Sequence, residues 1–480
     1  MKLICKCSFV VVMSALVCSG QTSTARRDRS EASSPDRGGP TVASSGIRGS
    51  SAQGKATADV LPLSLREVVE RGLKFNLALT ESGEDERVRR AQRLITLSRL
   101  LPDLSFRPSA SVQQVNLAAF GFTGFTGVPS IVGPFGLVDA RASVTQSLLD
   151  LRQMRNLKAD RESEVVAVQL GADLRGKVVI FVSGLYLQSL AARARVETQQ
   201  IQVKTAETIL RQATDRHDAG TVPRIDVLRV QVQLDVEQNR LIAFEGEFEK
   251  RKIDMARAIG LPSGQQILLT DSMPDEALPR DVTIEATLEQ AYAKRADFHA
   301  AQAAVRASEY ARSAALAGRY PTADAEANYG LNGPAIDHVH GTFAVSVGMN
   351  IPIFQGGRTK AEVEVADSLL RRRKAELDDL RGRIEAEVRT AFTDVRTAAR
   401  QVEVATRSAG LAREQLSESQ DRFSAGVTNN LEVVQAQQAV AVANENYIGA
   451  LFSLNTARAS FLLARGDAEQ AMLEFVRRTK

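Results

Sequence analysis

Apolar residues recur at every seventh position along two stretches of this chain, one in each half. In the first half these residues are Leu234, Leu241, Phe248 and Met255, and in the second half they are Val440, Tyr447, Leu454 and Phe461. A spacing of seven is typical of helices that pack against one another as coiled coils. The pattern therefore predicts two similar coiled-coil helices.

Two longer stretches, residues 151–217 and 358–423, contain no proline and keep a helical periodicity. With a rise of 1.5 Å per residue, each would form a helix roughly 100 Å long. Four shorter helices are expected at 64–100, 224–259, 285–318 and 430–465. Two short helices together match the length of one long helix. We therefore expect 224–259 to stack end to end with 285–318, and the other two to stack in the same way.

Four segments show the weak alternation of apolar and polar residues that is found in strands of membrane barrels. They cover residues 103–115, 138–149, 322–331 and 341–354. The Gly-rich residues 116–140 are predicted to hold a long loop between the first two strands. Each half of the chain thus has a strand pair between a short helix and a long one.

The two halves read as copies of one unit. At an offset of 206, three residues of "RHDAGTVPRIDVL" match three of "RFSAGVTNNLEVV": Arg216, Gly220 and Asp226 match Arg422, Gly426 and Glu432. Each of these segments predicts a helix end, a turn and a new helix that begins with an acid. We place the first repeat at 61–260, the second at 285–466 and a C-terminal tail at 467–480.

The N-terminus has the features of a secretory signal peptide at residues 1–20. Basic residues precede a short apolar run, which is followed by small residues. The three cysteines, Cys5, Cys7 and Cys18, all lie here, so a chain cleaved after this segment has no disulfide and no thiolate metal site. Cys18 is alternatively a lipid-bearing first residue. Residues 21–58 have the composition of a disordered linker.

Composition and motifs exclude several classes of function. The 61 basic residues are nearly balanced by 57 acidic ones, and no basic block is interleaved with aromatic residues, so nucleic acid is not an expected partner. The chain lacks a phosphate-binding Gly-rich loop and the G-x-S-x-G and H-E-x-x-H motifs. We therefore expect no enzymatic activity, no cofactor and no metal site. The segment "DHVH", Asp337 to His340, is interpreted as a polar turn.

Several short motifs occur in a fixed order around these elements. "LPDLSF" and "YPTADA" lead into strands, "QSLLD" and "NIPIFQGGR" lead out of them, and "IDVL" and "LEVV" follow the two R-x-x-A-G turns. Four strands cannot close a transmembrane barrel, so several chains must share one. In these respects residues 61–466 resemble the TolC-like outer-membrane efflux proteins, also called outer membrane factors.

The resemblance implies a mainly α-helical fold with a β-barrel contribution. Three copies would share a 12-stranded barrel in the bacterial outer membrane, with four transmembrane strands from each chain. Their helices would form a long antiparallel coiled-coil tunnel in the periplasm. The implied function is passive export of drugs, metals or proteins, as the channel of a tripartite efflux or type I secretion system. The implied partners are a periplasmic adaptor (membrane fusion) protein, an inner-membrane pump and outer-membrane lipid.

The resemblance also implies that the two turns form the periplasmic tip, where the adaptor docks and the tunnel narrows. Arg216, Gly220, Arg422 and Gly426 are the turn residues expected at the docking surface. Glu432 has two interpretations: it stabilises the start of its own helix, capped with Asn429, or it faces the axis in a ring of three acids.

Three further tip residues differ from the family pattern. Gln435 is uncharged where relatives carry a second aspartate, which weakens the predicted acidic ring. Thr428 and Phe423 stand where relatives carry the Arg and Tyr that latch the closed tip. We therefore expect Asp226 to lack its cation and phenol, and the gate to be held differently.

One alternative belongs to another class of protein. Long coiled-coil helices behind a signal peptide also suit a secreted structural or adhesion protein of the cell envelope. The strand pairs at matching places in both repeats and the acidic turn in each favour the export channel, because a fibrous protein needs neither.

Overall fold

The computed structural model describes residues 47, 49–51, 54–121, 129–262, 264–274, 283–425, 427–428 and 430–469. The chain divides into two compact units, Met1–Val42 and Ala43–Lys480, and the described residues all belong to the second. The predicted signal peptide with Cys18, and the turn residues Gly426 and Asn429, lie outside the described residues.

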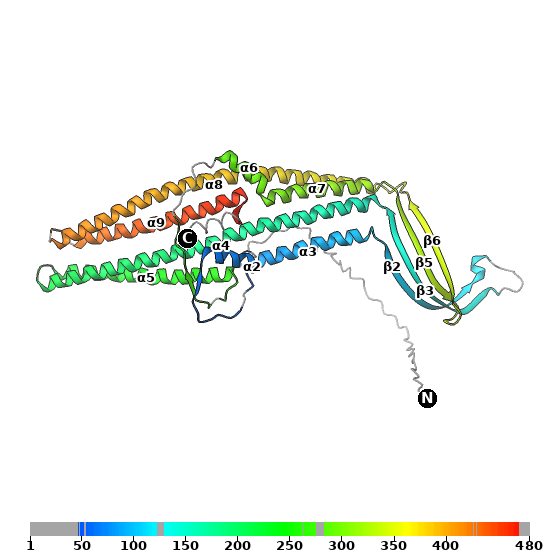
Figure 1. Cartoon of the computed structure of the whole chain (residues 1–480), viewed down its shortest axis with the longest axis horizontal. Helices are drawn as coiled ribbons and strands as arrows, with labels where there is room; N and C mark the ends of the chain where they lie inside the picture. Colours follow the sequence, from blue (N-terminus) through cyan, green and yellow to red (C-terminus); the bar gives the residue numbers. More distant parts are fainter. Residues whose placement is uncertain are drawn as a thin grey trace, which may run out of the picture. The chain divides into compact units, whose positions relative to one another are not determined.

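The same series of elements occurs twice in this unit (Figure 1). The first repeat contains α2 (Leu65–Phe75), α3 (Leu77–Ser98), β2 (Asp103–Asn116), η1 (Leu117–Phe120), β3 (Ile131–Leu149), α4 (Leu151–Asp218) and α5 (Arg224–Ala258). The second contains α6 (Ile284–Lys294), α7 (Ala296–Ala317), β5 (Thr322–Gly333), β6 (His340–Asn350), α8 (Arg358–Ser424) and α9 (Asn430–Arg465). The prediction of a mainly helical fold with one pair of long strands in each repeat is confirmed.

The two long helices lie where the sequence predicts them, and they have 68 and 67 residues. Asp150 begins α4, because its carboxylate accepts a hydrogen bond from the backbone N–H of Gln153 at 2.9 Å. No proline interrupts either helix, so backbone hydrogen bonding continues along its whole length. None of the described helices is both long and apolar enough to cross a membrane.

The predicted stacking of the short helices is wrong. A Cβ atom added to Gly260, just after α5, would lie 2.7 Å from Cβ of Phe75 at the break between α2 and α3. One added to Gly466, after α9, would lie 2.9 Å from the backbone N of Arg295, between α6 and α7. Each return helix therefore ends against short helices of its own repeat.

A small parallel sheet explains this arrangement in the first repeat. The chain that leaves α5 forms β4 (Ile267–Leu269), which pairs with β1 (Leu61–Leu63) directly before α2. Tyr186 of α4 lies under this pair, and its hydroxyl donates to the Leu63 carbonyl oxygen at 3.1 Å and to Asp271 Oδ2 at 2.9 Å. Burial and the nearby Asp271 raise the pKa of Tyr186 well above its usual value.

Two main hydrophobic clusters form the core, and each belongs mostly to one repeat. Buried residues of α2, α4 and α5, with β1 and β4, make up the first cluster. Residues of α8 and α9, joined by Ala291 and Phe298 beside the α6–α7 break, make up the second. The helices thus bury an apolar stripe against their neighbours, as their sequence periodicity predicts.

The first described residues pack on this body. The Asn76 side-chain amide donates to the Ile47 carbonyl oxygen at 2.7 Å, and Thr57 N–H donates to Gln265 Oε1 at 3.0 Å. Both Ile47 and Thr57 fall in the range 21–58 that the sequence predicts as a linker. Part of that range therefore has fixed contacts with the folded repeats.

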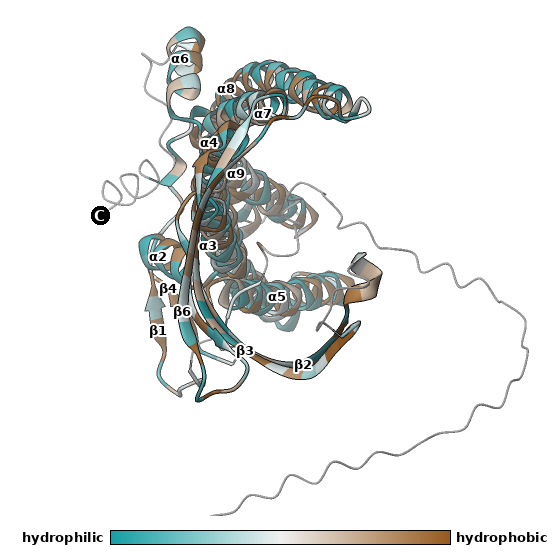
Figure 2. Cartoon of the chain, turned by 90° about the vertical axis from the view of Figure 1, so that its right-hand side faces the viewer, coloured by the Kyte–Doolittle hydropathy of each residue, from teal (hydrophilic) through white to brown (hydrophobic). Residues whose placement is uncertain are grey.

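The four long strands form an antiparallel sheet in the order β2-β3-β5-β6. The segment predicted as a loop contains η1 and the first residues of β3, and β6 ends at Asn350, before the predicted end at 354. The alternation of residues gives the sheet one apolar and one polar face, and hydrophobic and hydrophilic residues follow one another along β2 in Figure 2.

The apolar face has no cover among the described residues. Phe343 is 78% exposed and Val347 is 69% exposed on β6, and Leu104 and Phe106 are exposed in the same way on β2. Serines, threonines, asparagines and charged residues occupy the other face. A sheet with these two faces can separate an apolar medium from an aqueous one.

Candidate functional site

The helices that precede the two acidic turns end with the same backbone hydrogen bond. After α4, Thr221 N–H donates to the Arg216 carbonyl oxygen at 2.9 Å, and after α8, Val427 N–H donates to the Arg422 carbonyl oxygen at 3.0 Å. Gly220 has a left-handed φ of 76°, which a residue without Cβ adopts at no steric cost. The repeat in the sequence thus corresponds to a repeated helix-ending turn.

A contact between side chains joins the two turns. The guanidinium carbon of Arg216 lies 4.4 Å from the centre of the Phe423 ring, and Nη2 of the same arginine donates to the Ser424 carbonyl oxygen at 2.8 Å. Phe423 is only 4% exposed and packs in a cluster that both helical hairpins share: Ile209, Ala213, Val230 and Val433. The structure therefore brings the two predicted tip segments together.

Both acids of the turns have partners in their own hairpin. Asp226 pairs with Arg229, one turn further along α5, at 3.0 Å. Glu432 accepts a hydrogen bond from the Thr428 hydroxyl and lies 3.7 Å from Nη1 of Arg422. Asp226 thus has a cation from its own helix, although position 428 carries none.

The remaining predicted tip residue, Gln435, is exposed and stands three residues after Glu432 on α9. Residues three apart on a helix share a face, so Gln435 and Glu432 are presented on the same side. Thr428 stands where the sequence predicts that a latch arginine is missing, and its hydroxyl donates a hydrogen bond to Glu432. The sequence contained no signal for this hydrogen bond or for the Arg216–Phe423 contact.

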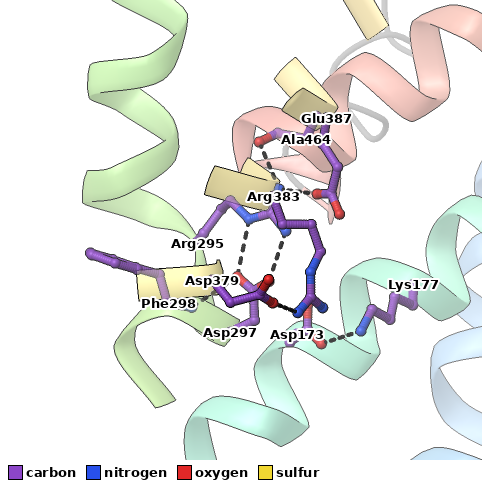
Figure 3. A network of polar contacts seen from close by, with 9 residues as sticks. All are labelled: Asp173, Lys177, Arg295, Asp297, Phe298, Asp379, Arg383, Glu387 and Ala464. Carbon is purple, nitrogen blue, oxygen red and sulfur yellow. Dashed lines mark hydrogen bonds and ion pairs between the residues drawn. The ribbon is translucent and has the colours of Figure 1, made fainter. Parts of the chain in front are cut away.

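A second polar cluster lies at the break between α6 and α7, away from the sites that the sequence predicts. Figure 3 shows Arg295 at its centre, with Asp297 and Glu387 beside it. Its side chain is 11% exposed. The guanidinium donates to both carboxylate oxygens of Asp297, at 3.0 and 2.7 Å, and to Glu387 of α8 at 2.6 Å. Nη1 also approaches the Ala464 carbonyl oxygen of α9 at 3.4 Å.

Burial and charge have opposite effects on the pKa values in this cluster. Burial disfavours the charged form of Arg295, but the two carboxylates outweigh it and raise its pKa. Burial likewise acts to raise the pKa of Asp297, but the bonds from Arg295 lower it below its usual range. For Asp173 of α4 the burial effect is larger than the attraction of Lys177, and its pKa is raised.

The Arg295 cluster links the α6–α7 break to α8 and to the end of α9. A cavity of about 990 Å³ lies beside it, between α4, α8, the α6–α7 break and the end of α9. Its acids and bases largely pair with one another, for example Lys294 with Asp467 at 3.4 Å and Lys177 with Asp173 at 2.6 Å. One faint signal for this site is present in the sequence: at an offset of 219 residues, Arg295 matches Asn76, the buried helix-capping residue of the first repeat.

No group of three or more metal-binding side chains occurs within the described ranges. In the "DHVH" segment His338 Nδ1 lies 3.0 Å from Asp337 Oδ1, and both side chains are largely exposed.

Comparison with known proteins decides the family. The model of the family described as "Outer membrane efflux protein" matches residues 69–261 and 287–467, which is most of both repeats. This chain belongs to the outer membrane efflux protein family. The resemblance to TolC-like channels is confirmed, and membership places the protein in the bacterial outer membrane, with a periplasmic helical domain. Family and fold are those of channels and efflux ducts.

Individual relatives of this efflux family are distant in sequence. The pyoverdine export outer membrane protein OpmQ of Pseudomonas putida is 22% identical over 306 residues, which cover 62% of this chain and 63% of OpmQ. The CmeC outer membrane channel of Campylobacter jejuni has a TM-score of 0.73 at 15% identity, covering 86% of this chain and 89% of CmeC. A membrane protein from Pseudomonas aeruginosa has the same TM-score at 18% identity, covering 84% and 93%. These structures share the fold.

Proposed function

We propose that three copies of this chain form one passive export duct through the outer membrane and the periplasm. Their twelve strands would close a single barrel in the membrane, and their helices would form the tunnel below it. An inner-membrane pump would supply the transport energy, and a periplasmic adaptor would join the pump to the helical tip, as in tripartite efflux or type I secretion systems.

The four-stranded sheet is the observation that carries this proposal. Its apolar face is exposed on every strand, from Leu104 on β2 to Phe343 on β6. Its two edge strands, β2 and β6, each have one side without a partner strand among the described residues. Unpaired backbone groups are costly in lipid, so the edges must pair with other copies. Closure against further copies satisfies both edges and leaves the polar face inside.

The surface around the two turns fits the predicted role of periplasmic tip. Exposed apolar side chains surround the two acidic turns: Ile225, Leu228, Val427 and Leu431. Exposed apolar residues grouped in this way are typical of a surface that binds another protein. In the proposed assembly the adaptor docks on this surface, including Arg216, Gly220, Arg422 and Gly426.

Glu432 is the acid best placed to act at the gate. It remains partly exposed beside Gln435, while Asp226 is more enclosed by its pair with Arg229. With three copies around an axis, the Glu432 carboxylates would form a ring that favours cations. Asp226, Thr428 and Phe423 would hold the hairpins that carry this ring.

Electron microscopy of the protein extracted from membranes in detergent tests the proposal. We expect three-fold particles with a compact cap and a hollow stalk roughly 100 Å long, the length of one long helix. Solid rods without a channel, or protein that is recovered without detergent, would overturn it in favour of a secreted structural protein.

A further inference from the structure

Two arginines lie directly opposite each other on the polar face of the sheet. Arg107 of β2 and Arg141 of β3 are register partners, so their side chains leave the same face at the same height. Like charges at such positions are destabilising in the absence of a compensating group. The pair therefore needs either an acid or a bound anion.

Arg141 satisfies its own charge by turning away from Arg107. Its Nε lies 3.3 Å from Asp139 Oδ1, Nη1 donates to Asn328 Oδ1 of β5 at 2.7 Å, and Nη2 lies 3.4 Å from Thr342 Oγ1 of β6. The guanidinium crosses β5 at Gly330, its register partner. A Cβ atom at position 330 would lie 2.8 Å from the Arg141 Cα, so a glycine provides the space for this crossing.

Arg107 has no such partner. Its side chain is exposed, and within the part of the chain that the structure describes it makes no ion pair. Asp139, the acid diagonally across β3, is already bound to Arg141. Two cations thus stand beside one carboxylate, which binds only Arg141, and the polar face has an excess positive charge at this height.

Closure with another copy does not remove this charge. In the proposed barrel the free edge of β2 pairs with β6 of the next chain. Residues 340–361, which include β6, contain no aspartate or glutamate. Whatever the register between copies, no carboxylate of that strand lies opposite Arg107.

We propose that Arg107, with Arg141 beside it, binds anionic groups inside the duct, such as the carboxylates or phosphates of an exported solute. This inference rests on the proposed function, because it requires the polar face to line a lumen. Three copies would make one cationic ring, and an arginine fork can hold a carboxylate or phosphate with two hydrogen bonds. On β2, Ser105 and then Asp103 follow Arg107 on the same face, toward α3. Asp103 and Glu326 of β5 are both register partners of Thr145, so they form an acidic row across the sheet. Anions therefore bind at the arginine row and are repelled from the acidic one.

Block of ion current through the full-length protein in planar bilayers tests the proposal, with inorganic tripolyphosphate as the probe. We expect tripolyphosphate to block the wild-type channel when it is added at the end of the duct that the sheet forms. Arg107→Gln should raise the half-blocking concentration about tenfold or more, because it removes a charged hydrogen-bond donor from each copy. Arg107→Lys should retain most of the block. The matched control is Arg90→Gln, which removes an exposed cation from α3 and should leave the block unchanged.

The outcomes separate the two proposals. If the wild-type protein forms channels and tripolyphosphate blocks Arg107→Gln at the same concentration as the wild type, the anion site is overturned while the duct stands. If Arg90→Gln weakens the block as much as Arg107→Gln, general surface charge is responsible and the site is again overturned. If properly assembled wild-type protein carries no current, the duct and the anion site are both overturned. Size-exclusion chromatography in detergent confirms that each variant retains the wild-type assembly.

Discussion

Arg216 of the first repeat stacks on Phe423 of the second, with 4.4 Å between the guanidinium carbon and the ring centre. The repeat-equivalent residues do not form this contact, since His217 Nδ1 lies 3.0 Å from the Val222 carbonyl oxygen and Arg422 approaches Glu432. The link between the hairpins is therefore one-sided, with the cation on α4 and the ring on α8. It occupies the position at which the sequence predicts a missing latch.

Arg216→Gln should loosen the tip, because it removes both the stacking on Phe423 and the charge-assisted hydrogen bond to Ser424. We expect a loss of about 1–2 kcal/mol in local stability. Hydrogen exchange of the amides around Phe423 should become faster, and channel conductance should rise. The matched control is Arg211→Gln, which removes an exposed cation five residues earlier on α4. If both variants exchange at the wild-type rate, the stacking does not hold the hairpins together.

Glu432→Gln should reduce the preference of the channel for cations, because it removes the proposed ring of three carboxylates. The reversal potential in a potassium chloride gradient measures this preference. Asp226→Asn provides the comparison, since that carboxylate is already paired with Arg229. Equal shifts for the two variants would contradict a special role for Glu432.

Thr428→Arg should lower open-channel conductance. The Thr428 hydroxyl binds Glu432, so an arginine at this position brings a cation to the same carboxylate and can tie it to the neighbouring hairpin. Single-channel recording measures the effect. Conductance equal to that of the wild type would show that position 428 does not control the gate.

Arg295→Met should destabilise the protein strongly, by about 3–5 kcal/mol, because Asp297 and Glu387 would lose the cation that compensates them. Thermal unfolding of the detergent-solubilised protein measures the change. Arg383→Met breaks a neighbouring ion pair with Asp379 in which both side chains are mostly exposed, and it should cost less than about 1 kcal/mol. Similar losses for the two variants would mean that burial of Arg295 does not matter.

The Arg295 cluster also predicts a dependence of stability on pH. The pKa of Asp297 is lower in the folded protein than its usual value of about 3.9. Its stabilising contribution is therefore fully present above that value and is lost as the pH falls below about 4. Asp297→Asn should reduce this acid-side loss in unfolding experiments between about pH 5 and 2. An unchanged pH profile would exclude Asp297 as a source of the dependence.

Val347→Arg and Ser346→Arg test the two faces of the sheet with neighbouring residues of β6. Val347 lies on the exposed apolar face, so a charge there should cost about 2–4 kcal/mol per chain in lipid and reduce the amount of folded protein in the outer membrane. Ser346 lies on the polar face and should tolerate the same change. Equal assembly of both variants, measured in isolated outer membranes, would contradict the proposed orientation.

Much of the fold was predictable from the sequence because its signals are local. The absence of proline from 151–217 and 358–423, together with their apolar periodicity, predicted α4 and α8 to within one residue at each end. Alternation predicted the four long strands, and the matched R-x-x-A-G segments predicted the ends of both long helices, which share a hydrogen bond to the Arg216 and Arg422 carbonyl oxygens. These features depend on residues close together in the chain.

Only the tertiary structure decided which distant segments meet. Helix lengths alone did not show that α5 ends against α2 and α3, because that choice depends on the pairing of β1 with β4. Arg229 follows Asp226 by three residues in the sequence, but residues at this spacing form an ion pair only when their side-chain rotamers allow it. The contact of Arg216 with Phe423 and the burial of Arg295 join residues far apart in the chain. Such contacts exist only where the packing of long helices brings their side chains together, and no local pattern encodes them.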